Sequence, residues 1–395
     1  MSQVGPLKDI RILELAGLGA APYAGMMLSD MGAEVIRIER MPPPPAFPDV
    51  LARGRRSIAL DLKQPDGLGA LLDLVSGVDA LIEGFRPGVA ERLGFGPGPC
   101  MERNPRLIYG RMTGWGQAGP LAHAAGHDLN YIALSGALLA IGPPGGKPVP
   151  PLNLIGDFGG GLLLCFGIAC ALLERERSGR GQVVDAAMLD AAASFMGMFC
   201  GFRAMGMFED GPGRSMLGGA AHFYDTYETA DGGFVAVAAI EPEFYAQLVA
   251  GLGLDPEEFL PYGFRGPGAR QDPAIWAVLK DRLAEVFRSR TRDEWSAVFE
   301  GSDACVSPVL GLSEASGHPH NRARETFVEL DGILQNGPAP RFSRTRPEQP
   351  RPAGEPGSDT TAVLAACGFD PDRLAKLAAD GVIPAIGKEG KGKHV

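Results

Sequence analysis

Short apolar runs alternate with amphipathic stretches over the N-terminal part of the chain. The runs predict strands and the stretches between them predict helices, because buried parallel strands are continuously apolar whereas crossover helices are not. Strands are expected over residues 10–15, 34–38, 57–62, 80–83 and 107–111, and helices over residues 22–31, 67–76 and 89–93. This alternation predicts an α/β fold with a Rossmann-like parallel sheet, whose ligands bind beyond the C-terminal ends of the strands.

The centre of the chain is predicted to be helical over residues 132–141, 162–173 and 182–207. The second of these helices is expected to be buried on all sides and too short to cross a bilayer. A glycine-rich linker then precedes two alternating strands, 222–229 and 234–240, joined by a turn that is typical of a hairpin. A smaller α+β domain is expected over residues 225–315, completed by helices at 242–251, 272–288 and 292–300.

The remainder of the chain is rich in proline and arginine. Residues 338–352 are expected to be extended over a surface and residues 360–367 to be helical.

Charge and cysteine usage narrow the class of protein. The 395 residues carry a net charge of −10, which argues against non-specific binding to nucleic acid or to an anionic membrane. The six cysteines are scattered without a C-x-x-C pair, as in a reduced cytosolic protein. The N-terminus shows no signal peptide. A cytoplasmic protein with partners other than nucleic acid or membrane is therefore expected.

Basic side chains recur at successive predicted strand ends. They are Arg37, Arg40, Arg53, Arg55, Arg56, Lys63, Arg86 and Arg92. Single charges are usually only solvated, but the ends of parallel strands converge on one crevice. Arginine supplies forked donors and lysine a point charge, so the set predicts a ligand with several phosphates, for which CoA is one candidate.

The turn from Gly17 to Pro22 follows a strand and opens a helix, like a dinucleotide-binding fingerprint, and Glu39 ends the next strand. The third glycine of that fingerprint is missing, and proline at a helix start is explained by its fixed φ. A tight strand–helix turn is favoured over a nicotinamide or flavin site.

His127 and Asp157 each precede a predicted helix. Alone, His127 is more often a structural histidine, Asp157 an N-cap, and Glu241, before Pro242, a surface residue. Together, an imidazole and a carboxylate at two helix N-termini form a plausible proton-transfer pair. A helix N-terminus is expected to favour an ionised Asp157 and a neutral His127, and its amides could stabilise an enolate oxygen.

Seven motifs spread over most of the chain give it a specific resemblance. It resembles the CaiB/BaiF (class III CoA-transferase) family and, within it, the branch that racemises 2-methylacyl-CoA thioesters. The matching segments are Leu81–Gly88, Met112–Gln117, Gly126–Asp128, Pro151–Asp157, Tyr224–Glu228, Ala239–Pro242 and Pro340–Ser343.

The resemblance implies a CoA-transferase family III fold in an interlocked homodimer. The large Rossmann-like domain would span residues 1–190 and be completed by residues 316–395, with residues 191–224 as a linker. The site would lie between one large domain and the partner's small domain, and it would need neither a metal nor a cofactor, because CoA is part of the substrate.

The resemblance also implies the site residues. His127 and Asp157 would transfer the proton, Glu241 would orient the imidazole, and Asn153 and Tyr224 would line the site. CoA would be held by Arg40, Leu60, Asp61, Leu62, Lys63, Gly84, Phe85, Arg86, Arg92 and the segment from Gly126 to Tyr131.

The histidine distinguishes two activities within the family. In the transferases the aspartate of the Gly-Asp motif is a nucleophile, and no histidine stands at the place of His127; the racemases have one. The predicted reaction is a 1,1-proton transfer at the α-carbon of a 2-methylacyl-CoA, through an enolate, with the two groups on opposite faces. The alternatives are a class III CoA-transferase using Asp157 as nucleophile, and a CoA-binding protein without turnover.

Six of the thirteen methionines fall between Met188 and Met216. They are interpreted either as adaptable core filling or as a deformable surface for acyl chains of differing shape. The second interpretation predicts broad acyl tolerance.

Overall fold

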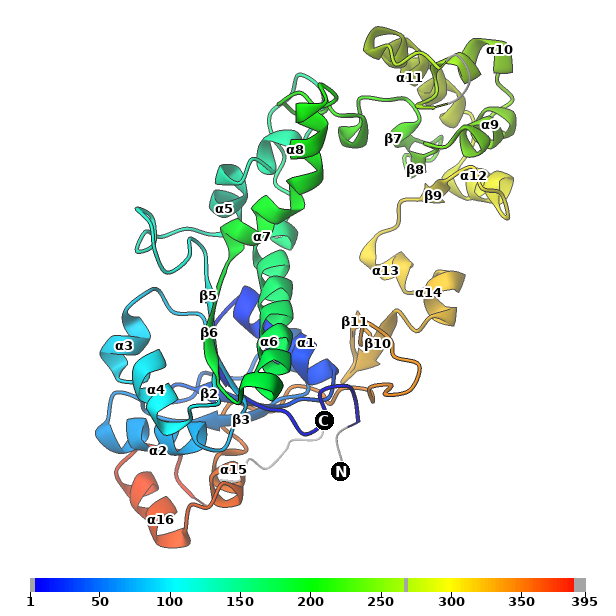
Figure 1. Ribbon diagram of the computed structural model, residues 1–395. Coiled ribbons are helices and arrows are strands. Elements are labelled where there is room, and N and C mark those ends of the chain that lie inside the picture. Colours follow the sequence, from blue (N-terminus) through cyan, green and yellow to red (C-terminus); the bar gives the residue numbers. More distant parts are fainter. Residues whose placement is uncertain (1–3, 266–268, 387–395) are drawn as a thin grey trace. The chain divides into compact units, whose positions relative to one another are not determined.

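The computed structural model describes residues 4–265 and 269–386, which form two compact units. The first unit contains the chain up to Ser135, Leu152–Ser194 and the chain from His320 onward. The second contains Gly136–Pro151 and Phe195–Pro319. The division therefore places residues 136–151 apart from the rest of the N-terminal region, and Figure 1 labels the elements of both units.

A six-stranded parallel sheet forms the centre of the first unit. Its order is β3-β2-β1-β4-β5-β6: successive strands are added to one side from β1 to β3 and to the other side from β4 to β6, and we call the point between β1 and β4 the reversal of the sheet. This confirms the Rossmann-like prediction and places the ligand crevice at the ends of β1 and β4. The strands are β1 (Arg11–Leu15), β2 (Glu34–Glu39), β3 (Arg56–Ala59), β4 (Ala80–Glu83), β5 (Ile108–Thr113) and β6 (Gln182–Ala187).

The last strand corrects the prediction of a helix over residues 182–207. Val183 and Val184 begin a strand that pairs with β5, and the helix starts only at Met188. The alanine-rich sequence after the strand has high helix propensity and hides the boundary, whereas the β-branched pair fits an edge strand. The helices that follow are α7 (Met188–Phe195) and α8 (Gly197–Ala204).

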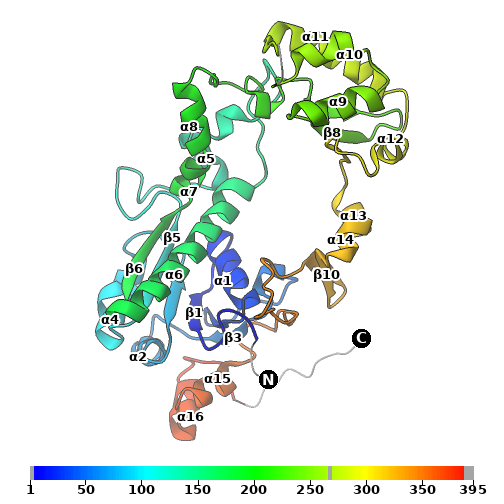
Figure 2. The same cartoon turned by 45° about the vertical axis from the view of Figure 1, so that its right-hand side comes forward.

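Helices cover both faces of the sheet. On one face, α1 and α6 contribute Ala24, Leu164 and Ile168 to the same core cluster as the strands; both views of the ribbon show these two helices side by side (Figure 2). On the other face, α2 packs with the C-terminal helices. The helices of this unit are α1 (Ala20–Asp30), α2 (Pro65–Val75), α3 (Val89–Leu93), α4 (Pro97–Arg103), α5 (Asp128–Leu134), α6 (Gly159–Ser178), α14 (Pro319–Ala323, at the unit boundary), α15 (Thr360–Ala366) and α16 (Pro371–Ala379).

The expectation that the long apolar helix is buried on all sides is wrong for this chain. Within α6, Phe166 is 67% exposed and Leu173 61% exposed, in line with Leu162 one turn before Phe166. The helical stretch Leu154–Ser178 is also long and apolar enough to cross a membrane, contrary to the expected short helix. Its other face, however, packs on the sheet and α1, so α6 is a core helix with one uncovered apolar stripe.

The second unit contains an antiparallel sheet covered by helices. The hairpin of β7 (Tyr224–Glu228) and β8 (Phe234–Ala238) is confirmed, and β8 also pairs with β9 (Val306–Pro308), which was too short to predict. Buried aromatic side chains, including Phe223, Tyr245 and Trp276, fill the core. The helices are α9 (Pro242–Gly251), α10 (Pro256–Phe259), α11 (Pro273–Phe287), α12 (Arg292–Phe299) and α13 (Leu312–Ala315).

The C-terminal region returns to the first unit through an unpredicted hairpin, β10 (Phe327–Leu330) and β11 (Ile333–Asn336). Arg53 reaches this hairpin: its Nη1 donates to Gln335 Oε1 (3.0 Å) and to the carbonyl of Asn336 (2.8 Å). Single-turn elements complete the chain: η1 (Val50–Ala52), η2 (Leu138–Ala140), η3 (Leu154–Phe158), η4 (Met216–Gly218) and η5 (Leu260–Tyr262), of which η3 is π-helical.

Candidate active site

The turn after β1 brings the backbone close to a predicted catalytic group. Gly19 has a φ of +70°, and a Cβ at this position would lie 2.9 Å from Oδ2 of Asp157. Only glycine adopts this conformation cheaply and leaves that space to the carboxylate. The glycine turn that resembles a dinucleotide fingerprint thus accommodates Asp157 at the reversal of the sheet.

His127 is the residue before α5, and its backbone is held while its side chain is exposed. The His127 amide donates to Asn130 Oδ1 (3.1 Å). The hydroxyl of Tyr131 donates to the carbonyl of Gly126, and its ring packs edge-on against Trp115 with 4.8 Å between centroids. The loop carrying the imidazole is therefore fixed from one side, and the ring remains open to solvent.

Asp157 lies half-buried in the π-helical turn η3, directly before α6. Asn153 Nδ2 donates to its Oδ2 (3.0 Å). Burial raises the pKa of Asp157, and the charge of Asp128 raises it further; the Asn153 hydrogen bond and the His127 charge oppose the shift without overcoming it. His127 and Asp157 are thus close enough to interact electrostatically. The direction of this pKa shift is opposite to the one expected from a helix N-terminus, and burial is its largest cause.

The backbone amides of Gly156 and Asp157, just before α6, already donate hydrogen bonds to another side chain. Asp128 Oδ2 accepts hydrogen bonds from the backbone of Gly156 (2.6 Å) and Asp157 (2.8 Å). An enolate oxygen would have to displace a carboxylate to reach them, so these two amides do not serve as the oxyanion donors expected from the sequence.

A cavity of about 190 Å³ opens at the loops that follow β4 and β5; Gly126, the residue before His127, lines it, whereas His127 and Asp157 themselves do not. Its wall includes Arg86, Trp115 and Met188, together with Gly84, Phe85, Pro87, Met112, Thr113, Gly114, Ala122, Ala124, Gly126 and Tyr131. Buried Glu83 holds the loop after β4, because its carboxylate accepts from the Phe85 amide (2.7 Å) and from Arg111 Nε (2.9 Å). The cavity therefore has one rigid wall at the reversal of the sheet.

The basic residues at the strand ends fall into two groups, apart from half-buried Arg56, which pairs with Glu34 at 3.6 Å and with Asp359 at 3.9 Å. Three are buried in ion pairs inside the fold: Arg37 with Glu14 and Glu39, Arg53 with Asp30, and Arg55 with Glu14. These three cannot also bind phosphates, which corrects their inclusion in the predicted phosphate-binding set. In contrast, Arg40, Lys63, Arg86 and Arg92 are exposed, and within the described residues no ion pair joins them to another side chain.

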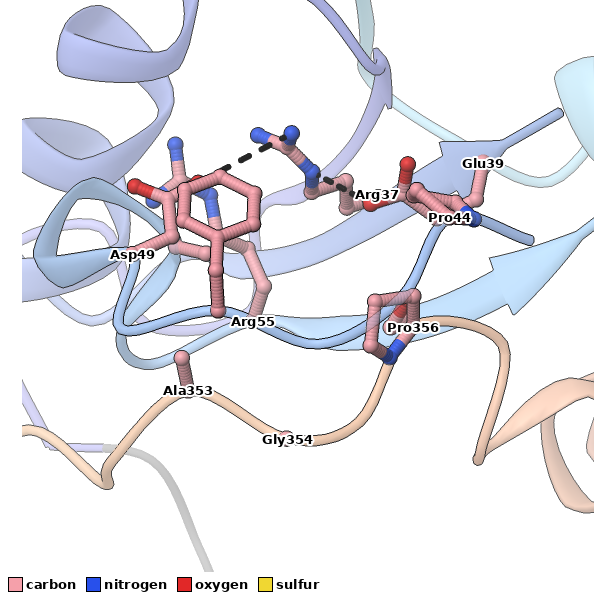
Figure 3. A pocket seen from close by; sticks show the side chains of 11 residues that line it. Arg37, Glu39, Pro44, Asp49, Arg55, Ala353, Gly354 and Pro356 are labelled. Atoms are coloured by element: carbon pink, nitrogen blue, oxygen red, sulfur yellow. Dashed lines mark hydrogen bonds and ion pairs between the residues drawn. The ribbon is translucent and has the colours of Figure 1, made fainter.

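A second hollow, of about 40 Å³, lies over β2 and β3 (Figure 3). Arg37 and Arg55 line it together with Glu39 and Asp49, and Arg37 pairs with Glu39 at 2.6 Å. Opposite charges already satisfy each other here, and the volume is close to that of a single water molecule. This hollow is part of the structural ion-pair network.

The other predicted site residues are distributed over both units. Leu60 is buried, and the Asp61 carboxylate accepts from the Lys63 amide (3.1 Å) and so shapes its own turn. Tyr224, half-buried in β7, and Glu241, exposed before α9, belong to the second unit.

The chain belongs to CoA-transferase family III, whose model matches residues 7–360. It is 45% identical to α-methylacyl-CoA racemase of Mus musculus, over 95% of this chain and 97% of the relative, and 43% identical to that of Homo sapiens over the same shares. Among solved structures, a CaiB/BaiF family protein from Brucella suis matches with a TM-score of 0.78 and 26% identity, covering 92% of this chain and all of the other. The family and the fold predicted from the sequence are both confirmed.

Three residues at this site were not singled out from the sequence. Asp128 and Trp115 lie inside motifs that carried the resemblance, and Gly19 lies in the turn assigned only a structural role. Composition around Asp128 gave no sign of its partners, because these come 28 and 29 residues later in the chain.

Proposed function

We propose that this protein is an α-methylacyl-CoA racemase, which interconverts the two enantiomers of 2-methylacyl-CoA thioesters. The observation that supports this most directly is the placement of His127 and Asp157 in one unit, within electrostatic reach of each other, with Gly126 before His127 and Tyr131 of α5 in the wall of a cavity. The relatives matched over nearly the whole chain support the same activity.

In the proposed reaction one of the two groups removes the proton from C2 of the thioester and leaves an enolate. The other group then returns a proton to the opposite face of C2, and the roles exchange for the other enantiomer. The raised pKa of Asp157 suits both roles, since a carboxyl nearer to the working pH gives up and accepts a proton with a smaller free-energy change.

The four exposed cations are proposed to bind the phosphates of CoA. Arg40, Lys63 and Arg86 follow the C-terminal ends of the parallel strands β2, β3 and β4, and Arg92 lies on the next short helix, α3. This edge of the sheet is the same one on which the cavity opens, so the thioester end of the substrate can enter beside His127.

The acyl chain is proposed to lie on methionine side chains. Met188 lines the cavity in the first unit, and the second unit exposes Met198, Met205 and Met207 on its own surface. Thioether side chains adapt to differing shapes, which a racemase needs because it must hold both enantiomers.

The protein is further proposed to work as an interlocked homodimer in the cytoplasm, without a metal or organic cofactor. In that assembly the partner's small domain would supply Tyr224 and Glu241 to the site. The exposed stripe of Leu162, Phe166 and Leu173 on α6 supports a covered face in the assembly.

Incorporation of deuterium from solvent at C2 tests the proposal. Wild type is expected to exchange this proton in both enantiomers of a 2-methylacyl-CoA, and His127→Ala and Asp157→Ala are each expected to lose about 10²- to 10⁴-fold in exchange rate, the usual contribution of a general acid or base. Prior dialysis against a chelator is expected to leave the wild-type rate unchanged.

A class III CoA-transferase would give a different result in the same assay. Asp157 would then form an acyl adduct that hydroxylamine traps, and CoA would pass between acids without exchange at C2. Trapping of this adduct, together with the absence of deuterium at C2, would overturn the proposal that the protein is a racemase.

A further inference from the structure

A buried carboxylate next to His127 has no part in the proton transfer described above. Asp128 begins α5 and is only 6% exposed. Its Oδ2 does not bond to the amides of its own helix; it accepts from the amides of Gly156 and Asp157 instead, at 2.6 and 2.8 Å. One side chain thus joins the helix that follows His127 to the turn that carries Asp157.

The packing around this bridge is tight. A Cβ on Gly156 would lie 2.5 Å from Oδ2 and 2.9 Å from Cγ of Asp128. The other carboxylate oxygen, Oδ1, is buried and has no hydrogen-bond partner within the described part of the chain. A half-satisfied buried carboxylate is costly for stability, so its presence needs an explanation other than stability.

We propose that Asp128 is a positioning residue that sets the separation between the His127 imidazole and the Asp157 carboxyl. The inference rests on the proposed function, because this separation matters only if both groups act on one carbon. Two short hydrogen bonds to a charged acceptor are stronger than neutral ones, so they resist the displacement of one segment from the other. Catalysis needs the reacting atoms within about 3–3.5 Å, and a misplacement of about 1 Å can cost 10²-fold in rate.

Asp128 also acts on Asp157 through its charge. It raises the pKa of Asp157 in the same direction as burial, whereas Asn153 and the His127 charge lower it. Burial raises the pKa of the Tyr131 phenol, and the negative charge of Asp157 raises it further. Removal of the Asp128 charge therefore lowers the pKa of Asp157, and the acid limb of the rate in which Asp157 is the base moves to lower pH.

The test compares Asp128→Ala and Asp128→Asn with wild type in the C2 deuterium-exchange assay, for both enantiomers and over a range of pH. Asp370→Asn is the matched control, since Asp370 also accepts a backbone amide (Arg373, 2.8 Å) but at α16. Asp128→Ala is expected to lower kcat about 10²-fold, with KM changed less than threefold, and the control to match wild type. Asp128→Asn, which keeps an acceptor and the side-chain volume, is expected to lose less in kcat and to shift the acid limb to lower pH.

Backbone hydrogen exchange over residues 153–158 gives a readout that does not depend on the reaction. Both variants are measured, and protection at Gly156 and Asp157 is expected to fall about tenfold or more in Asp128→Ala only, as one lost hydrogen bond implies. Unchanged protection overturns the bridge whether or not the protein is a racemase. Lost protection with kcat within twofold of wild type overturns the positioning role and leaves the racemase intact. Absence of deuterium exchange in wild type itself overturns the proposed function and, with it, the positioning role.

Discussion

At the scale of single residues, neighbouring groups shift the pKa of the Asp157 carboxyl in opposite directions. Burial and Asp128 favour the protonated form of Asp157, while the Asn153 amide and the His127 charge favour the ionised form. Each neighbour comes from a different position in the sequence, so substitutions should move the pKa of Asp157 in predictable and opposite directions.

Asn153→Ala removes a hydrogen bond to the ionised carboxylate. The pKa of Asp157 should rise further, so the ionised base appears only at higher pH and the acid limb of kcat moves upward. The pH profile of deuterium exchange from the enantiomer that Asp157 deprotonates measures this shift. A limb that moves downward, as expected for Asp128→Asn, would contradict the assignment of the Asn153 hydrogen bond.

At the scale of elements, two short turns after parallel strands shape the surroundings of the proposed site. The turn after β1 leaves room for Asp157, and the loop after β4 is fixed by Glu83 through the Phe85 amide. Neither turn contributes a titrating group, yet both determine where the substrate can lie.

Gly19→Ala is expected to reduce activity because the added methyl group displaces Asp157, and not because of backbone strain. The new Cβ would lie 2.9 Å from the Asp157 carboxylate and displace it, which should cost about 10²-fold in kcat. Gly381→Ala is the matched control, because Gly381 has the same φ of +70° and no atom within 4 Å of the place that a Cβ would take. Both variants should lose similar stability in thermal unfolding, and only the first should lose deuterium exchange; equal activity of the two would refute the steric explanation.

At the scale of the whole molecule, the C-terminal region completes the unit that the N-terminal region begins. Arg53 is 1% exposed and pairs with Asp30 at 2.6 Å, and the same guanidinium holds the hairpin of β10 and β11. The apolar core of β3 and α2 likewise includes Val363 and Leu364 of α15. The core of the first unit therefore contains residues from both ends of the chain.

Arg53→Met leaves Asp30 buried without its partner and removes the bonds to the hairpin. Breaking a buried pair in this way should lower the free energy of unfolding by about 3–5 kcal/mol. Arg103→Met removes an exposed pair with Asp73 and should cost about 0–1 kcal/mol. Urea unfolding of both variants measures the two free energies of unfolding. Equal decreases would show that burial does not determine the strength of these ion pairs.

Phe166→Glu tests the proposed dimer. A charge in the exposed stripe of α6 should weaken association by about 2 kcal/mol or more, as expected for a central interface aromatic, and sedimentation should show the dissociated chain. Val278→Glu, at an equally exposed apolar position on α11, provides the comparison. An unchanged dimer with Phe166→Glu would exclude this stripe from the interface.

The sequence by itself determined five of the six strands of the sheet, most helices and the family, and it supplied His127 and Asp157 as the predicted reacting pair. Strand–helix alternation is a local signal, and the motifs around His127 and Asp157 are contiguous, so both can be read along the chain. Prediction from the sequence failed at β6, because the helix propensity of the following segment masks the strand boundary. It also failed at the exposed face of α6, because an apolar run does not show which side of a helix is covered.

Only the tertiary structure decided which charged side chains are free of ion pairs and what surrounds the carboxyl of Asp157. Arg37, Arg53 and Arg55 look like Arg40 and Arg86 in the sequence, but their carboxylate partners lie many residues away and bury them. The raised pKa of Asp157 likewise depends on burial and on Asp128, which meets it across 29 residues of chain. Burial and ion pairing are properties of distant segments brought together, so no local pattern contains them.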